Sequence, residues 1–164
     1  MNDEILFATE DQLADLAPAE EAIDSQKFLI FLCDGLRLGV VAEWVVEILT
    51  NLPITYLPMM PDYIPGIINM RGQIIPIVDV RLRLGKMPAA DEKQNSNLII
   101  VLNIEGTQLG ILVDAVDQMI DIPKENILPM PAHSQQLLVS GMCSLPDDSG
   151  TMMVLDCGQL MPHD

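Results

Sequence analysis

The sequence predicts a mainly β fold: two small barrels of about five short strands each, packed on a shared aliphatic core, with short helices between some strands. Three observations predict it. Apolar runs of strand length are cut by Gly, Pro and acidic-Gly pairs; the pattern of the first half returns in the second; and the chain is 49% hydrophobic but only 4% aromatic. A small barrel leaves no sheet edge exposed, but a unit of ~70 residues is marginal alone, so the two units are expected to share a core.

The N-terminal segment differs in composition from the rest. Residues 1–26 hold eight Asp and Glu residues and no Lys or Arg, which is half of the net charge of −16. A short acidic segment buries too little apolar surface to order itself, so we expect a flexible tail. A short amphipathic helix is the alternative, since one face would carry Ile5, Leu6, Leu13 and Leu16. Residues 27–164 are then the folded domain.

The first unit, about residues 27–90, begins with an expected hairpin. Two apolar runs meet at Asp34-Gly35, where Gly accepts the positive φ of a tight turn. Residues 43–49 are expected to form a short amphipathic helix, because Val45, Ile48 and Leu49 have helical spacing. The runs 54–60, 64–70 and 73–80 are expected strands, since several prolines there exclude long helices.

An internal repeat predicts the second unit, about residues 97–160. With a shift of 71 positions, FLIFLCDG (28–35) aligns with IIVLNIEG (99–106), and small insertions carry the alignment on to TMMVLDC (151–157). Apolar runs match one another easily by chance, but a shared apolar pattern does not require the Gly, Pro and Asp residues between the runs to coincide. The residues that coincide are Gly39 with Gly110, Gly66 with Gly141, Pro58 with Pro129, and Asp79 with Asp156.

Charge and cysteine content limit the class of function. The chain has 24 acidic and 8 basic residues, which argues against nucleic acid and anionic membrane surfaces. The acidity would suit a partner with basic patches, and the alternative is that it serves to keep an apolar protein in solution. Three Cys residues far apart, without CxxC spacing, predict reduced core thiols in a cytosolic protein. The start lacks the basic region of a signal peptide, and no uncharged apolar stretch is long enough to cross a membrane.

The sequence carries no recognisable catalytic, metal or cofactor pattern. Its two His residues, His133 and His163, have no ligand-type neighbours at metal-site spacing, and no GxSxG, HExxH, P-loop or GxGxxG motif occurs. Asp79 and Asp156 follow strands at equivalent places, which favours helix capping over a paired-carboxylate site. We therefore expect a protein that presents surfaces and is not an enzyme.

The stretch GIINMRG (66–72) is the most distinctive. Where the first unit has NMRGQ, the second has SLPDDSG, so Arg71 belongs to the first unit alone. An Arg side chain can bind a carboxylate with two hydrogen bonds and is enriched in interfaces, whereas an exposed pair with a neighbouring acid is worth only ~0–1 kcal/mol.

These residues also carry a resemblance. The segment with VVEIL (45–49), then LP (57–58), then IPGIINMRGQIIPIVDVR (64–81) resembles the CheW-like family of chemotaxis coupling proteins, and the likeness spans roughly residues 27–160. It implies two SH3-like five-stranded barrels. It also implies an adaptor that links the cytoplasmic tips of methyl-accepting chemoreceptors to a CheA-type histidine kinase, in the cytoplasm at membrane receptor arrays. It marks Arg71 and Glu47 for these contacts, and we take Asn69, Met70 and Gly72 beside Arg71 as further candidate interface residues.

Trp44 departs from the family pattern, which usually has a polar residue there. It is either an exposed anchor for a partner, as Trp often is, or a side chain packed over the small Ala42. Two other functions stay open. One is a barrel that binds a small ligand between the units, and the other is a CheW-like module that regulates a kinase without receptors.

Overall fold

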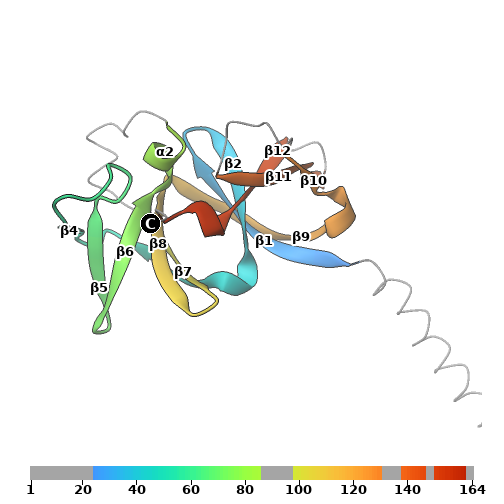
Figure 1. Cartoon of the computed structure of the whole chain (residues 1–164). Coiled ribbons are helices and arrows are strands. Elements are labelled where there is room, and N and C mark those ends of the chain that lie inside the picture. Colours follow the sequence, from blue (N-terminus) through green and yellow to red (C-terminus); the bar gives the residue numbers. More distant parts are fainter. Residues whose placement is uncertain (1–23, 86–97, 131–137, 147–149, 162–164) are drawn as a thin grey trace, which may run out of the picture.

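The computed structural model describes residues 24–85, 98–130, 138–146 and 150–161 (Figure 1). They form two six-stranded sheets, which confirms the mainly β prediction. The first half contains β1 (Ser25–Cys33), β2 (Leu36–Val41), η1 (Ala42–Trp44), β3 (Val45–Thr50), β4 (Thr55–Tyr56), β5 (Gly66–Met70), β6 (Gln73–Asp79) and α2 (Val80–Arg83). The second half contains β7 (Leu98–Ile104), β8 (Thr107–Val113), β9 (Ala115–Pro123), η2 (Lys124–Asn126), β10 (Leu128–Pro129), β11 (Val139–Ser144), β12 (Thr151–Leu155) and η4 (Cys157–Gln159).

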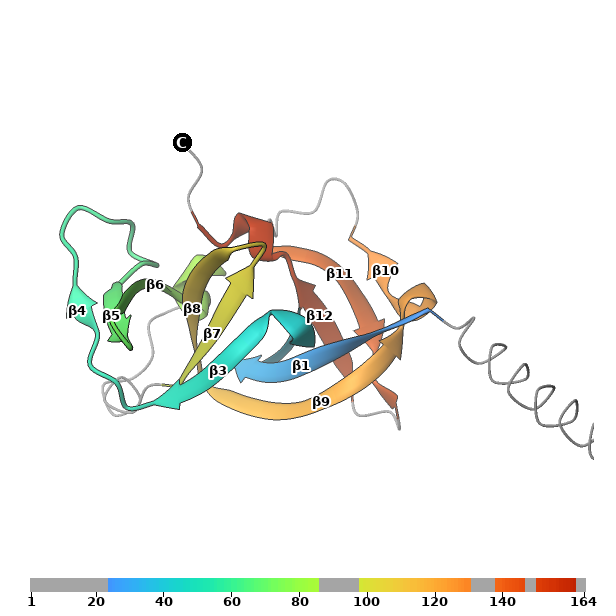
Figure 2. The ribbon, with the colours of Figure 1, turned by 90° about the horizontal axis from the view of Figure 1, so that it is seen from below.

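Each sheet takes strands from both halves of the chain. One sheet has the order β10-β11-β12-β2-β1-β9 and the other β4-β5-β6-β8-β7-β3, so the same order appears twice with the repeats exchanged. The first hairpin of each repeat thus completes the sheet of the other. We call them sheet A, which contains β1, and sheet B, which contains β7 (Figure 2). The units 27–90 and 97–160 are repeats of the sequence, and as a division into domains they stay a prediction.

The parallel strand pairs show how closely the repeats correspond. In sheet A, β12 pairs with β2 so that Val154 faces Gly39, and in sheet B, β6 pairs with β8 so that Ile77 faces Gly110. A Cβ at Gly39 would lie 2.4 Å from Sδ of Met152, and one at Gly110 would lie 2.7 Å from Cδ1 of Ile77. The repeated glycines therefore stand where side chains of the parallel neighbour cross closely.

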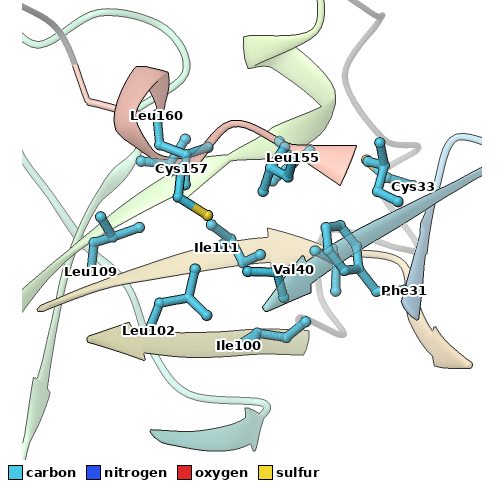
Figure 3. Close-up of a cluster of buried hydrophobic side chains, with 14 of the residues drawn as sticks. Phe31, Cys33, Val40, Ile100, Leu102, Leu109, Ile111, Leu155, Cys157 and Leu160 are labelled. Carbon is cyan, nitrogen blue, oxygen red and sulfur yellow. The ribbon is translucent and has the colours of Figure 1, made fainter. Parts of the chain in front are cut away.

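The core has three parts, as two units with a common interior require. One cluster belongs to sheet A and includes Phe28 and Ile30, and another belongs to sheet B and includes Ile75 and Ile99. The largest lies between the sheets, and Figure 3 shows it. It includes Leu29, Phe31, Val40, Ile100, Leu102, Leu109, Ile111, Leu155 and Leu160. Both faces of β1 and β7 are therefore buried, and the shared aliphatic core is confirmed.

The prediction of a helix at 43–49 is wrong. The residues form a single 3-10 turn, η1, followed by strand β3. Val45, Glu47 and Leu49 are half-buried while Val46, Ile48 and Thr50 are exposed, so burial alternates with the period of two that a strand has. β-branched residues favour this pleated surface, and pairing with β7 overrides the weak helical spacing.

The short elements after β6 and β12 begin as predicted. The side chain of Asp79 accepts a hydrogen bond from the amide of Leu82, and that of Asp156 accepts one from the amide of Gly158. The helix weighed for residues 5–16 lies outside the described residues. Across the described ranges, none of the helices has the length and apolar character needed to cross a membrane.

Candidate partner-binding surface

The β5–β6 turn shows what the four residues Asn69 to Gly72 do. Met70 pairs with Gln73, so Arg71 and Gly72 are the two turn residues, with φ of 53° and 86°. Two positive φ values are typical of the tight hairpin turn that suits the twist of a sheet. Oδ1 of Asn69 accepts a hydrogen bond of 3.0 Å from the amide of Gly72, and Met70 is buried in the core of sheet B. The hairpin is thus held from inside and presents Arg71 at its tip.

Arg71 and Glu47, which the resemblance singles out separately, form one ion pair. Nη2 of Arg71 donates to Oε1 of Glu47 over 2.8 Å, and the two side chains are 71% and 29% exposed. Glu47 lies on β3 at one end of sheet B, while the β5–β6 turn belongs to strands near the other end. The pair therefore requires sheet B to curl, so that the β5–β6 turn comes within hydrogen-bond distance of β3.

The exposure of this pair limits what it adds to stability. A solvent-exposed ion pair is worth ~0–1 kcal/mol, and holding Arg71 in the left-handed region has a cost of its own. The φ of 53° at Arg71 matches those of Asp34 and Glu105, which occupy the same place in other hairpin turns, so it belongs to the turn and fixes the direction of the side chain. The geometry is therefore better suited to presenting a guanidinium than to stabilising the sheet.

Two apolar residues next to Glu47 escaped the sequence analysis. Val46 and Ile48 are 45% and 41% exposed and lie on the outer face of β3. A helix over 43–49 does not place Val46 and Ile48 on a common face. An alternating strand over VVEILT does, together with Thr50. The surface around Glu47 thus combines an ion pair at the end of the sheet with exposed aliphatic side chains.

The structure places Trp44 against the shared core, where it is half-buried. This position is nearer to the packed interpretation than to an exposed anchor, and a role of Trp44 in partner contacts stays a prediction. The contact roles of Asn69, Met70 and Gly72 stay predictions, since the structure gives each of them a part in forming the turn.

Sequence analysis also missed a second ion cluster, at Arg81. This side chain is only 11% exposed and donates from Nη1 to Asp34 over 2.8 Å and from Nη2 to Asp114. Oδ2 of Asp114 also accepts the amide of Asp34 over 2.8 Å. Burial, with help from the Asp114 charge, raises the pKa of the adjacent Cys33 thiol to about 12. The local sequence Arg81-Leu82-Arg83 does not indicate such a cluster, because both acidic partners lie far away in the chain.

Surface hollows among the described residues lie elsewhere. One of about 470 Å³ is lined by Pro61, Asp62, Tyr63, Leu82 and Gly85, and another of about 200 Å³ lies between the β7–β8 turn and η4. Within the described parts of the chain, no three His, Cys, Asp or Glu side chains are grouped to hold a metal ion.

Comparison with known proteins gives a consistent result. A family model described as CheW-like domain matches residues 27–164. The chain is 30% identical over 130 residues to a chemotaxis protein CheW of Klebsiella aerogenes, covering 79% of this chain and 77% of the relative. It is 32% identical over 118 residues to protein FrzA of Myxococcus xanthus, covering 71% and 72%. A crystal structure of the scaffolding protein TtCheW from Thermoanaerobacter tengcongensis superposes with a TM-score of 0.72 at 30% identity, over 81% of this chain and 90% of the other.

Proposed function

Because this chain belongs to the CheW-like family, we propose that it is a chemosensory adaptor that couples chemoreceptors to a CheA-type histidine kinase. It acts by protein contacts and without catalysis, in the cytoplasm at receptor arrays. Two comparisons support this role, since relatives of similar length are chemotaxis proteins and the matching solved structure is a scaffolding protein.

The observation that carries the proposal is the Arg71–Glu47 pair. In a chain with a net charge of −16, a guanidinium that is 71% exposed at a rigid hairpin tip is an unusual feature. The planar guanidinium can leave Glu47 and bind a carboxylate or backbone carbonyl of a partner, or it can bind Glu47 and the partner group at the same time. The exposed Val46 and Ile48 add apolar area to the neighbouring face of β3.

Arg71→Glu tests the proposal directly. It places two carboxylates where an ion pair stood, so we expect binding of the kinase, the receptor or both to fall at least tenfold while the fold is kept. The measurement is a pull-down in which the variant captures the kinase and the receptor, each purified from the native host. Circular dichroism checks that the variant is folded. Lys27→Glu is the matched control, because Lys27 is also an exposed base near an acid, 3.9 Å from Asp121, but lies on sheet A. Unchanged capture of both partners by folded Arg71→Glu would refute the proposal.

The double variant Arg71→Glu with Glu47→Arg separates two roles of the pair. If the pair only holds the ends of sheet B together, the exchanged charges restore binding. If Arg71 itself contacts the partner, the exchange does not restore it, and we expect this second result.

The same pull-down distinguishes the two other functions. Capture of the kinase alone, with no receptor under any condition, indicates a regulator that works without receptors. Capture of neither partner by the native chain favours a ligand-binding barrel.

A further inference from the structure

Two seams join sheet A to sheet B, one for each repeat. At the first seam, α2 meets the β1–β2 turn and the β8–β9 junction (Figure 1). Arg81, the second residue after the capping Asp79, inserts there between Asp34 and Asp114. This seam is closed by an arginine of the chain itself.

The second seam has the same acids but lacks the arginine. By the repeat, Glu105 stands where Asp34 does, Glu43 where Asp114 does, and Gly158 where Arg81 does. Gly158 is likewise the second residue after a capping aspartate, Asp156. Glu43 and Glu105 are both exposed, and among the described residues neither is in an ion pair.

The backbone at the two seams corresponds in register as well as in sequence. Phe31 pairs with Val116 near the first seam, and their equivalents Leu102 and Val45 pair near the second. Each pairing lies beside a β-bulge, one after Ile30 and the other after Val45, at equivalent places. The acids of the second seam are thus held on the same framework as those that bind Arg81.

A small hollow lies beside Gly158 at the second seam. The β7–β8 turn approaches η4 (Figure 2), and between them is an open space of about 200 Å³. Its walls are mostly apolar: Ile104, Thr107, Leu109, Cys157, Gly158 and Met161. Gly158 has no side chain to fill this space, and Ile104, the chain neighbour of Glu105, lines it on the other side.

We propose that the second seam is a docking site for a protein segment that presents an arginine next to an apolar side chain. The guanidinium takes the place that Arg81 has at the first seam, between Glu105 and Glu43, and the apolar neighbour enters the hollow. Arginine suits the site better than lysine, because one guanidinium at the first seam binds two carboxylates at once through Nη1 and Nη2. The acidity of the chain favours the approach of a basic segment.

A graft of the missing residue is the first test. Gly158 does not have a positive φ, and a Cβ there would meet only Oδ1 of Asp156, at an ordinary 3.4 Å. Gly158→Arg should therefore fold and fill the seam from within, raising the melting temperature of the full chain by about 1–3 °C. Gly158→Gln is the control without charge, and Gly158→Arg combined with Glu105→Gln should lose the gain. An equal rise in Gly158→Gln, or no loss in the double variant, would contradict the geometry.

A peptide titration tests the docking itself. The probe is the amide of acetyl-Leu-Arg-Leu, added to the ¹⁵N-labelled full chain, with the citrulline peptide as an uncharged control of the same shape. We expect amide shifts confined to residues 42–44, 104–109 and 157–161, with a dissociation constant on the order of 1 mM that rises at least fivefold in Glu105→Gln and in Gly158→Arg. Equal shifts with the citrulline peptide, shifts spread over other surfaces, or no shifts at all would overturn the proposal. Arg71→Glu should leave this titration unchanged, so its outcome is separate from that of the proposed adaptor surface.

Discussion

Arg71 and Arg81 lie ten residues apart, and their surroundings give them opposite roles. Arg81 is 11% exposed and its two carboxylate partners come from other elements, so removing it would leave two close acids without their counter-charge. Arg71 is 71% exposed with a single partner. Arg71 adds little to stability and lies at a rigid turn, so it can bind a partner without loss to the fold. Arg81, by contrast, stabilises the fold.

Asp79 should make stability depend on pH. Burial raises the pKa of its carboxyl above 3.8 in the folded protein, so ionising it costs more in the folded state than in the unfolded chain. The free energy of unfolding therefore loses a contribution as pH rises through the folded pKa, and keeps it in full below pH 3.8. Asp79→Asn retains a capping oxygen and cannot ionise. Urea unfolding from about pH 4 to about pH 8 should show the Asp79→Asn variant gaining on the wild type as pH rises, and a constant difference would contradict this.

The three thiols should be unreactive in the folded protein. Burial raises the pKa of Cys33 and of Cys157 to about 12, and it raises the pKa of Cys143 in the same direction. At pH 8 a thiol with a pKa of about 12 is thiolate in roughly one molecule in 10,000. Alkylation by iodoacetamide, followed by mass spectrometry, should therefore label none of them until urea unfolds the chain. Native labelling at the rate of free cysteine would show that the thiols are accessible.

Among the elements, β3 shows where sequence patterns are ambiguous. Val45, Ile48 and Leu49 fit a helical spacing, but the burial of the six residues of β3 alternates as in a strand. The neighbouring strand decides between helix and strand, because β7 provides hydrogen-bond partners for the backbone of β3. By contrast, the β5–β6 hairpin was predictable in detail, since Asn-Met-Arg-Gly between apolar runs indicates a turn with its own mechanism.

Gly66 is the glycine whose replacement should cost the most. A Cβ there would lie 2.0 Å from the carbonyl oxygen of Thr55, which is backbone of the paired strand β4 and cannot move aside cheaply. Gly66→Ala should lower the free energy of unfolding by about 1–3 kcal/mol.

Gly39→Ala is the informative comparison, because its Cβ meets the flexible side chain of Met152 instead of backbone. We expect it to cost less than Gly66→Ala, with Gly158→Ala close to neutral, in urea unfolding of the three variants. A greater loss for Gly39→Ala than for Gly66→Ala would contradict the close backbone approach.

At the scale of the whole molecule, the exchange of hairpins is the main feature. β1 and β2 complete sheet A, whose other strands come from the second half, and β7 and β8 complete sheet B in return. The sequence correctly predicted the mainly β fold and the shared core. It did not predict the exchange, because a hairpin has the same local sequence pattern whichever sheet it joins. Likewise, the Arg71–Glu47 pair depends on how sheet B curls, which no local pattern states.

The exchange predicts that neither half folds alone. A fragment of residues 1–90 lacks β7 and β8, and one of residues 91–164 lacks β1 and β2, so each would leave core strands unpaired. Each purified fragment should give the circular dichroism of an unfolded chain, and an equimolar mixture should recover the β spectrum of the intact protein. A cooperative unfolding transition in either fragment by itself would show that the repeats are independent.

The parallel pairing of β6 with β8 also has a consequence for biosynthesis. β6 ends at Asp79, but its neighbour β8 ends only at Val113, so the ribosome must add about 34 further residues before that ladder can form. Because translation proceeds at about 5–20 residues per second, this edge of β6 stays unpaired on the nascent chain for a few seconds. Translation speed and chaperone access over residues 80–113 therefore bear on the yield of correctly folded protein.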